Sequence, residues 1–180
     1  MPRGPAGGDR GGAESMRTQR LVYADVSRRL TSGGALAVSP LAGTGADFGV
    51  WRAGREDTKR LVELKCAHSH TIAKRSGAKR WAFHAHGTAG NGAKHSLWSQ
   101  CSESGAAILL LSWKAPGGAR SFFPVLLADL TTTQRRTLRV RHLNRTEEDL
   151  EREFTCSQFE GCRTVLASGL EGALAALLPA

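Results

Sequence analysis

Two short apolar runs separated by a charged segment stand out in the first half of the chain. The runs are ADFGVW at 46–51 and RLVELK at 60–65, and the segment between them, RAGREDTK, is polar and rich in turn-forming residues. Two such runs around a polar connection predict a β-hairpin. Because side chains alternate between the two faces of a strand, Glu63 and Lys65 are expected on one face and Leu64 on the other.

The apolar pattern also predicts the elements around this hairpin. Apolar residues at helical spacing, among them Val22, Val26 and Leu30, predict a helix over 16–30. The other expected elements are strands at 35–41, 79–86, 106–113 and 121–127, and a short helix at 94–104. The run AAILLLSW at 106–113 is nearly all apolar, so we expect a central strand that is covered on both faces. The predicted strand at 121–127 contains Pro124, which lacks a backbone N–H and therefore favours an edge position for this strand.

The last third of the chain predicts one strand and two helices. Within 131–145, the stretch RTLRVRHL alternates like a strand with arginines on one face, either as a solvated edge or as a contact to a DNA backbone. Thr146 followed by acidic residues resembles a helix cap, which predicts a helix over 146–158. A second, apolar helix is expected at 163–178.

The order of these elements predicts an α/β fold with a central mixed β-sheet flanked by helices. Residues 1–15 are rich in glycine and proline, and we expect a disordered tail, with Met16 as an alternative start and a single domain over 16–180. The sequence shows no apolar run long enough to cross a membrane and no hydrophobic signal-peptide core. We therefore expect an intracellular protein of the cytoplasm or nucleoid.

The charge of the chain points to a polyanionic partner. Lys and Arg number 25 against 16 Asp and Glu, which gives a formal net charge of +9. A balance this basic favours nucleic acid as the partner. The residues expected to contact its phosphates follow the hairpin and are Lys74, Arg75, Lys79, Arg80 and Lys94.

The hairpin carries a cluster suited to phosphodiester chemistry. Asp47 and Glu63 lie on neighbouring strands, and two carboxylates at close range repel each other and raise a pKa unless a cation lies between them. Magnesium is held by one or two carboxylates together with waters and substrate phosphates, and such an ion activates water. Lys65 beside the carboxylates can orient that water or neutralise developing charge.

The arrangement D-(x15)-E-x-K, formed by Asp47, Glu63 and Lys65, resembles the PD-(D/E)XK nuclease superfamily, which includes restriction endonucleases and archaeal Holliday-junction resolvases. Ala46 stands where the proline of that name would be. The resemblance implies a restriction-endonuclease-like core and a DNA endonuclease of restriction, junction or repair type. It makes Asp47, Glu63 and Lys65 catalytic, with Asp47, Glu63 and the Leu64 carbonyl as ligands of Mg²⁺, or of Mn²⁺ in its place.

The same resemblance suggests accessory positions. Asp25, on the helix before the first core strand, could help to hold metal, although a local ion pair would also explain it. Gln100 lies on the helix ahead of the buried strand, and His68 could lie near the scissile phosphate. A one-site nuclease that cuts both strands also favours a symmetric homodimer, with helix 163–178 as the expected contact.

Three alternatives stay open at this point. The chain could bind nucleic acid without cutting it, with a purely structural acidic cluster. It could cut RNA, because nothing in the sequence is specific for the 2′-hydroxyl. Two His-x-His pairs could instead bind zinc; they are His68 with His70 and His84 with His86.

Overall fold

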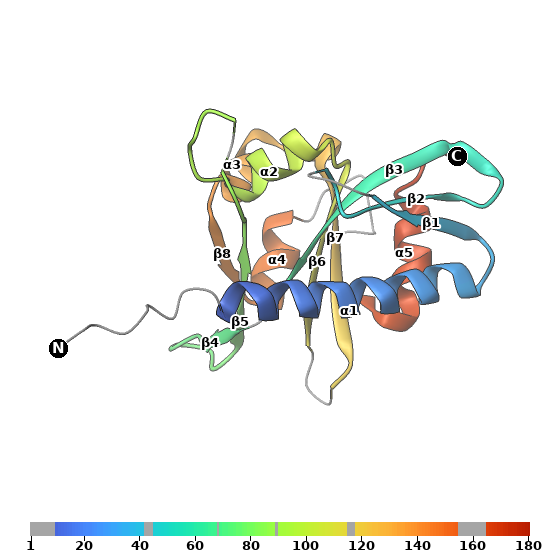
Figure 1. Ribbon diagram of the computed structural model, residues 1–180. Coiled ribbons are helices and arrows are strands. Elements are labelled where there is room, and N and C mark those ends of the chain that lie inside the picture. The colour runs from blue at the N-terminus through green and yellow to red at the C-terminus, as the bar shows by residue number, and fades with distance from the viewer. Residues whose placement is uncertain (1–9, 42–44, 68, 89, 115–117, 155–164) are drawn as a thin grey trace.

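The predicted hairpin is present and forms part of a larger sheet (Figure 1). The computed structural model of the chain describes residues 10–41, 45–67, 69–88, 90–114, 118–154 and 165–180. In it, β2 (Phe48–Arg52) and β3 (Arg55–Cys66) pair antiparallel, with Phe48 opposite Val62. The connection is shorter than predicted, so that β3 begins at Arg55, because Gly54 has a φ of 75° and permits a tight two-residue turn.

The hairpin belongs to a mixed sheet of five strands extended by a two-residue sixth strand. The strand order is β1-β2-β3-β6-β7-β9, in which β3 and β6 are parallel and the other neighbours are antiparallel. The remaining strands are β1 (Leu36–Pro40), β6 (Ile108–Lys114), β7 (Arg120–Leu126) and β9 (Val165–Leu166). Strand β9 pairs with Ser121 and Phe122, so Pro124 lies beyond the part of β7 that has a second neighbour. The predicted α/β class with a central mixed sheet is confirmed.

A second, smaller sheet packs beside the first. It has the order β4-β5-β8, formed by β4 (His70–Ile72), β5 (Lys79–His84) and β8 (His142–Arg145). Strand β5 matches the strand predicted over 79–86, whereas β4 has too few apolar residues to be predicted.

Helices cover both faces of the main sheet. On one face, α1 (Arg10–Ser32) and α5 (Leu170–Ala176) pack on apolar side chains of β3 and β6, and α1 lies across the sheet in Figure 1. On the other face lie α2 (Leu97–Ser104), α4 (Glu147–Phe154) and the smaller sheet. Strand β6 is therefore buried on both faces, as its composition predicted. None of the helices in the described ranges is long and apolar enough to cross a membrane.

The prediction of a strand within 131–145 is wrong for most of that stretch. Residues Thr132–Leu138 form helix α3, and only His142–Arg145 form a strand. The Thr131 hydroxyl accepts from the Gln134 N–H at 3.2 Å, while the Gln134 side chain accepts from the Thr131 N–H at 2.8 Å. This capping box starts a helix and overrides the alternating arginine pattern.

The bounds of the terminal helices also differ from the prediction. Helix α1 begins at Arg10 rather than at residue 16, and residues 1–9 lie outside the described part of the chain. Helix α5 is shorter than the predicted 163–178, and its Leu170 and Leu174 are buried against the main sheet. Leu170 and Leu174 are therefore used within the chain, and the homodimer contact expected at this helix stays a prediction.

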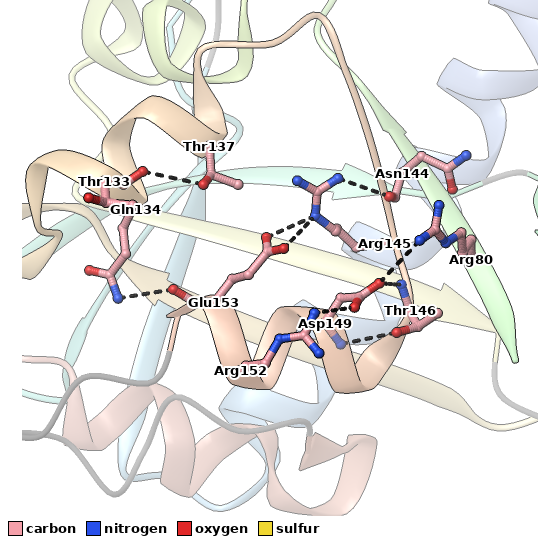
Figure 2. Close-up of polar contacts among 10 residues, drawn as sticks. All are labelled: Arg80, Thr133, Gln134, Thr137, Asn144, Arg145, Thr146, Asp149, Arg152 and Glu153. Carbon is pink, nitrogen blue, oxygen red and sulfur yellow. Dashed lines mark hydrogen bonds and ion pairs between the residues drawn. The ribbon is translucent and has the colours of Figure 1, made fainter. Parts of the chain in front are cut away.

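Polar contacts around α4 join the smaller sheet to two helices (Figure 2). Thr146 and Asp149 form the predicted cap, each accepting from the other's backbone N–H. The Arg145 side chain of β8 donates to the Glu153 carboxylate at 2.8 Å, and Gln134 of α3 donates to the Glu153 carbonyl at 3.2 Å. Asp149 and Glu153 of α4 thus neutralise part of the positive charge on β5 and β8.

Candidate functional site

Asp47 lies just before β2, beside Val62 and Leu64 of β3. Its backbone N–H donates to the Val62 carbonyl at 3.0 Å. Its side chain accepts from the Leu64 N–H at 2.7 Å and from the Gln19 amide of α1 at 2.8 Å. These three contacts fix the carboxylate between helix α1 and the part of β3 that extends past the end of β2.

Glu63 and Lys65 form a buried ion pair on the other side of β3. In the parallel pairing of β3 with β6, Glu63 is opposite Leu109 and Lys65 is opposite Leu111, on the face of the sheet that α2 covers. The Lys65 Nζ lies 2.8 Å from a Glu63 carboxylate oxygen, and each side chain is only 4% exposed. A buried ion pair is costly to desolvate and often stabilises a fold less than apolar residues would, so its presence in a central strand favours a functional role.

Burial raises the pKa of both carboxyl groups. For Asp47, burial outweighs the Leu64 N–H, the Lys65 charge and the Gln19 amide, all of which lower the pKa. For Glu63, burial is again the largest cause, and the charge on Asp47 raises the pKa further, against the lowering effects of Lys65 and of the Ser104 hydroxyl. The expected repulsion between the two acids is present, but desolvation contributes more.

The Leu64 carbonyl is a third possible oxygen ligand, and it faces the Asp47 side of β3. The N–H and C=O groups of one strand residue point to the same side of the strand. Because the Leu64 N–H donates to Asp47, the Leu64 carbonyl oxygen also faces the Asp47 side of β3. Two carboxylates and one carbonyl are hard oxygen donors of the kind that magnesium prefers. Within the described ranges, no cluster of three or more His, Cys, Asp or Glu side chains occurs, and magnesium does not require one.

Two pockets flank these residues, one on each face of the main sheet. The pocket on the α1 side has a volume of about 380 Å³, and both Asp47 and Leu64 line it. The pocket on the α2 side has a volume of about 490 Å³, and Ser104 lines it within hydrogen-bonding reach of Glu63. Asp47 therefore lines the α1-side pocket, whereas Glu63 lies on the α2 side of β3, and the effect of the Asp47 charge on the Glu63 pKa indicates that the two carboxylates are nevertheless close.

The three accessory residues suggested by the resemblance are Asp25, Gln100 and His68, and the structure describes two of them. Asp25 does not reach Asp47, because its carboxylate pairs with Arg28 and Arg29 along the exposed side of α1. Gln100 accepts from the His86 N–H at 3.1 Å and lines the α2-side pocket. His68 lies outside the described residues.

Gln19 is the α1 residue that does reach the site, and sequence reasoning missed it. It precedes Val22, Val26 and Leu30 at helical spacing, so its position lies on the apolar face of the helix. A long polar side chain at an apolar position was the available signal, because a buried amide needs a hydrogen-bond partner.

The basic residues predicted to bind DNA fall into two groups. Lys74, Arg75, Lys79 and Arg80 lie on β5 and the turn before it, and all four are exposed. Within this group, Arg80 lies 4.0 Å from Asp149. Lys94 lies apart from this group and forms an isolated β-bridge with Thr88, which lines the α2-side pocket.

The described histidines of the two His-x-His pairs do not lie together as a zinc site would require. His84 lies beside His142 of the neighbouring strand, in contact through their Nδ1 atoms. His70 packs on Trp81 with ring centroids 5.0 Å apart, and His86 lines the α2-side pocket. These three described histidines thus lie in separate surroundings, and a four-histidine zinc site is not formed among them.

Comparison of the chain with protein-family models, curated proteins and solved structures finds no match.

Proposed function

We propose that this protein is a metal-dependent endonuclease that hydrolyses DNA phosphodiester bonds. The observation that supports this best is the arrangement of Asp47 beside β3 with a buried Glu63–Lys65 pair on the same stretch of that strand. The Asp47 charge acts on Glu63, and the Lys65 charge acts on both acids. The cost of burying these charges supports a functional role over a merely structural one.

In this proposal, Asp47, Glu63 and the Leu64 carbonyl hold a magnesium or manganese ion. When bound, such an ion stabilises charge on a phosphate and lowers the pKa of a water. Both acids must be ionised to act as ligands, so protons compete with the metal ion, and the raised pKa values extend that competition to higher pH. The Lys65 ammonium has three donors, so it can keep its contact with Glu63 while it orients the attacking water.

The positive charge of the chain supports nucleic acid as the substrate. The exposed group on β5 and the turn before it, together with Lys94, can neutralise phosphates on a strand that reaches the site. A restriction, junction or repair substrate would fit this description, and no described feature selects among them. DNA is proposed over RNA because of the resemblance in the Asp47, Glu63 and Lys65 pattern.

The proposal is tested with supercoiled plasmid DNA in magnesium, in manganese and in a chelator. We expect nicking by the wild type in either metal and none in the chelator, and a loss of at least about 100-fold in Asp47→Asn. Asp57→Asn is the matched control, because Asp57 is an exposed carboxylate paired with Arg55. Binding of the plasmid without nicking would favour the non-catalytic alternative, and cleavage of RNA but not DNA would change the substrate.

Gln19 is expected to act as a positioning residue for Asp47. Replacing it with leucine removes the amide that donates to Asp47, and outer contacts of this kind are worth about 10–100-fold in metal affinity or activity. In Gln19→Leu we therefore expect the magnesium concentration for half-maximal nicking to rise by about that factor. The control is Thr18→Val, one residue away on α1. An unchanged magnesium requirement in Gln19→Leu would mean that Asp47 needs no support from α1.

A further inference from the structure

The pocket on the α1 side is in direct contact with the candidate site. Asp47 and Leu64 form one wall, α1 forms the opposite wall, and the end of β1 closes it. Its lining residues are Gln19, Arg20, Tyr23, Pro40, Leu41, Asp47 and Leu64. If Asp47 helps to hold the metal ion at the scissile phosphate, this pocket is the space next to that phosphate.

The pocket combines a flat apolar wall with a cation. The Tyr23 ring is half-buried and packs on Phe48, with ring centroids 5.4 Å apart. Pro40 and Leu41 extend this apolar surface, and the exposed Arg20 follows Gln19 on the helix. Nucleic-acid bases stack on aromatic side chains, whichever base is present, and arginine neutralises the attached phosphate.

A base that belongs to a paired duplex cannot enter such a pocket. To reach Tyr23, the base has to leave its stack and its partner, and this costs least for a mismatched or single-stranded base. The pocket volume of about 380 Å³ lies at the lower end of the range for small-molecule sites, which fits one nucleotide better than a stacked pair.

We infer that this pocket receives the unstacked base of the nucleotide next to the scissile phosphate, so that the enzyme favours strands in which that base is unpaired. The inference rests on the proposed nuclease function and adds its substrate class. Single strands, mismatches and flaps then belong to the preferred class, and fully paired duplex does not.

The test compares labelled oligonucleotides that share one sequence and are single-stranded, mismatched at one position, fully paired, or single-stranded with one abasic position. For the wild type, we expect kcat/KM to be at least tenfold higher on single-stranded DNA than on paired DNA. In Tyr23→Leu, kcat/KM on single-stranded DNA should fall about tenfold, because stacking is lost. The same variant should cut as fast as the wild type where the abasic position adjoins the cut, because no base is there to stack.

Two controls separate the pocket from its surroundings. Arg28→Ala changes an exposed arginine on the same helix that pairs with Asp25 outside the pocket, and it should cut like the wild type. Binding of the same oligonucleotides in calcium, followed by fluorescence anisotropy, gives a readout that does not depend on cleavage. There Tyr23→Leu should weaken binding of the intact single strand but not of the strand with the abasic position.

Several results would overturn the inference. They are equal cutting of paired and single-stranded DNA by the wild type, or equal losses in Tyr23→Leu on intact and abasic strands. If the wild type cuts nothing, the proposed function fails, and the binding comparison alone then decides whether the pocket holds a base.

Discussion

Replacing Lys65 with methionine is expected to abolish DNA cleavage and to lower the free energy of unfolding at pH 7 by about 3–5 kcal/mol. The ammonium lies 2.8 Å from Glu63, and both side chains are almost fully buried. Methionine keeps the apolar volume of the stem but leaves the Glu63 carboxylate without its cation. Nicking of plasmid DNA and chemical denaturation at pH 7 measure the two effects.

The pH dependence of this variant has a definite sign. The Lys65 charge is the largest of the effects that lower the Glu63 pKa, so its removal raises that pKa further. As the pH falls below the raised pKa, Glu63 becomes neutral and the stability deficit of Lys65→Met should disappear. The double variant Glu63→Gln with Lys65→Met has neither charge, so it should recover stability at pH 7 while it stays inactive. A stable Lys65→Met protein at pH 7 would show that the pair is solvated.

Magnesium is expected to stabilise the wild type against thermal unfolding, and this stabilisation should vanish in Asp47→Asn and in Glu63→Gln. An ion that binds only the folded state adds about 2.7 kcal/mol when its concentration is 100 times its dissociation constant. Each substitution removes one of the two anionic ligands proposed for that ion. Thermal melts of the three proteins with and without magnesium make the measurement, and Asp57→Asn should keep the wild-type shift.

The raised pKa values set the pH dependence of these melts. A carboxyl group whose pKa is raised by folding destabilises the folded state once the pH exceeds its unfolded pKa, and this cost is complete above its folded pKa. Without metal at pH 7, Asp47→Asn should therefore be at least as stable as the wild type, and its advantage should shrink in acid. Glu63→Gln should instead be less stable at pH 7, because it leaves the buried Lys65 ammonium without its partner. Protons compete with magnesium for the same oxygens, so the wild-type shift should fall as the pH falls through the raised pKa values. Equal magnesium shifts in all the proteins would place the ion elsewhere.

Local sequence patterns predicted much of the sheet. The hairpin follows from two apolar runs around turn-forming residues, and the doubly covered strand β6 follows from a continuous apolar run. The alternation of side chains along a strand placed Glu63 and Lys65 on one face, but it could not tell that α2 would bury that face, because the covering helix is distant in sequence. The sequence therefore predicted the charged residues of the site but not the environment that shifts their pKa values.

One wrong prediction and one missed residue have local causes. The arginines before residue 142 alternate like those of a strand, yet the capping box at Thr131 decides for a helix. On α1, Asp25 was considered because it is acidic, and the structure shows the local ion pair that was its alternative explanation, whereas Gln19 reaches the site because of its position on the buried face. The position of a residue on the buried face of α1 was therefore a better guide to the site than its charge.

The parallel pairing of β3 with β6 has a consequence for how the protein folds. Strands β1 to β3 form one set of consecutive antiparallel neighbours and β6 with β7 forms another, so each set can form early from local contacts. Joining them pairs Val62 with Ile108 and closes a loop that contains β4, β5 and α2, and we expect this to be the slow step of folding. Glu63 and Lys65 lie on this junction and lose their water there, so the chemistry of the site opposes the assembly of its own sheet. We therefore expect the buried charges on which the proposed activity depends to slow the assembly of this sheet.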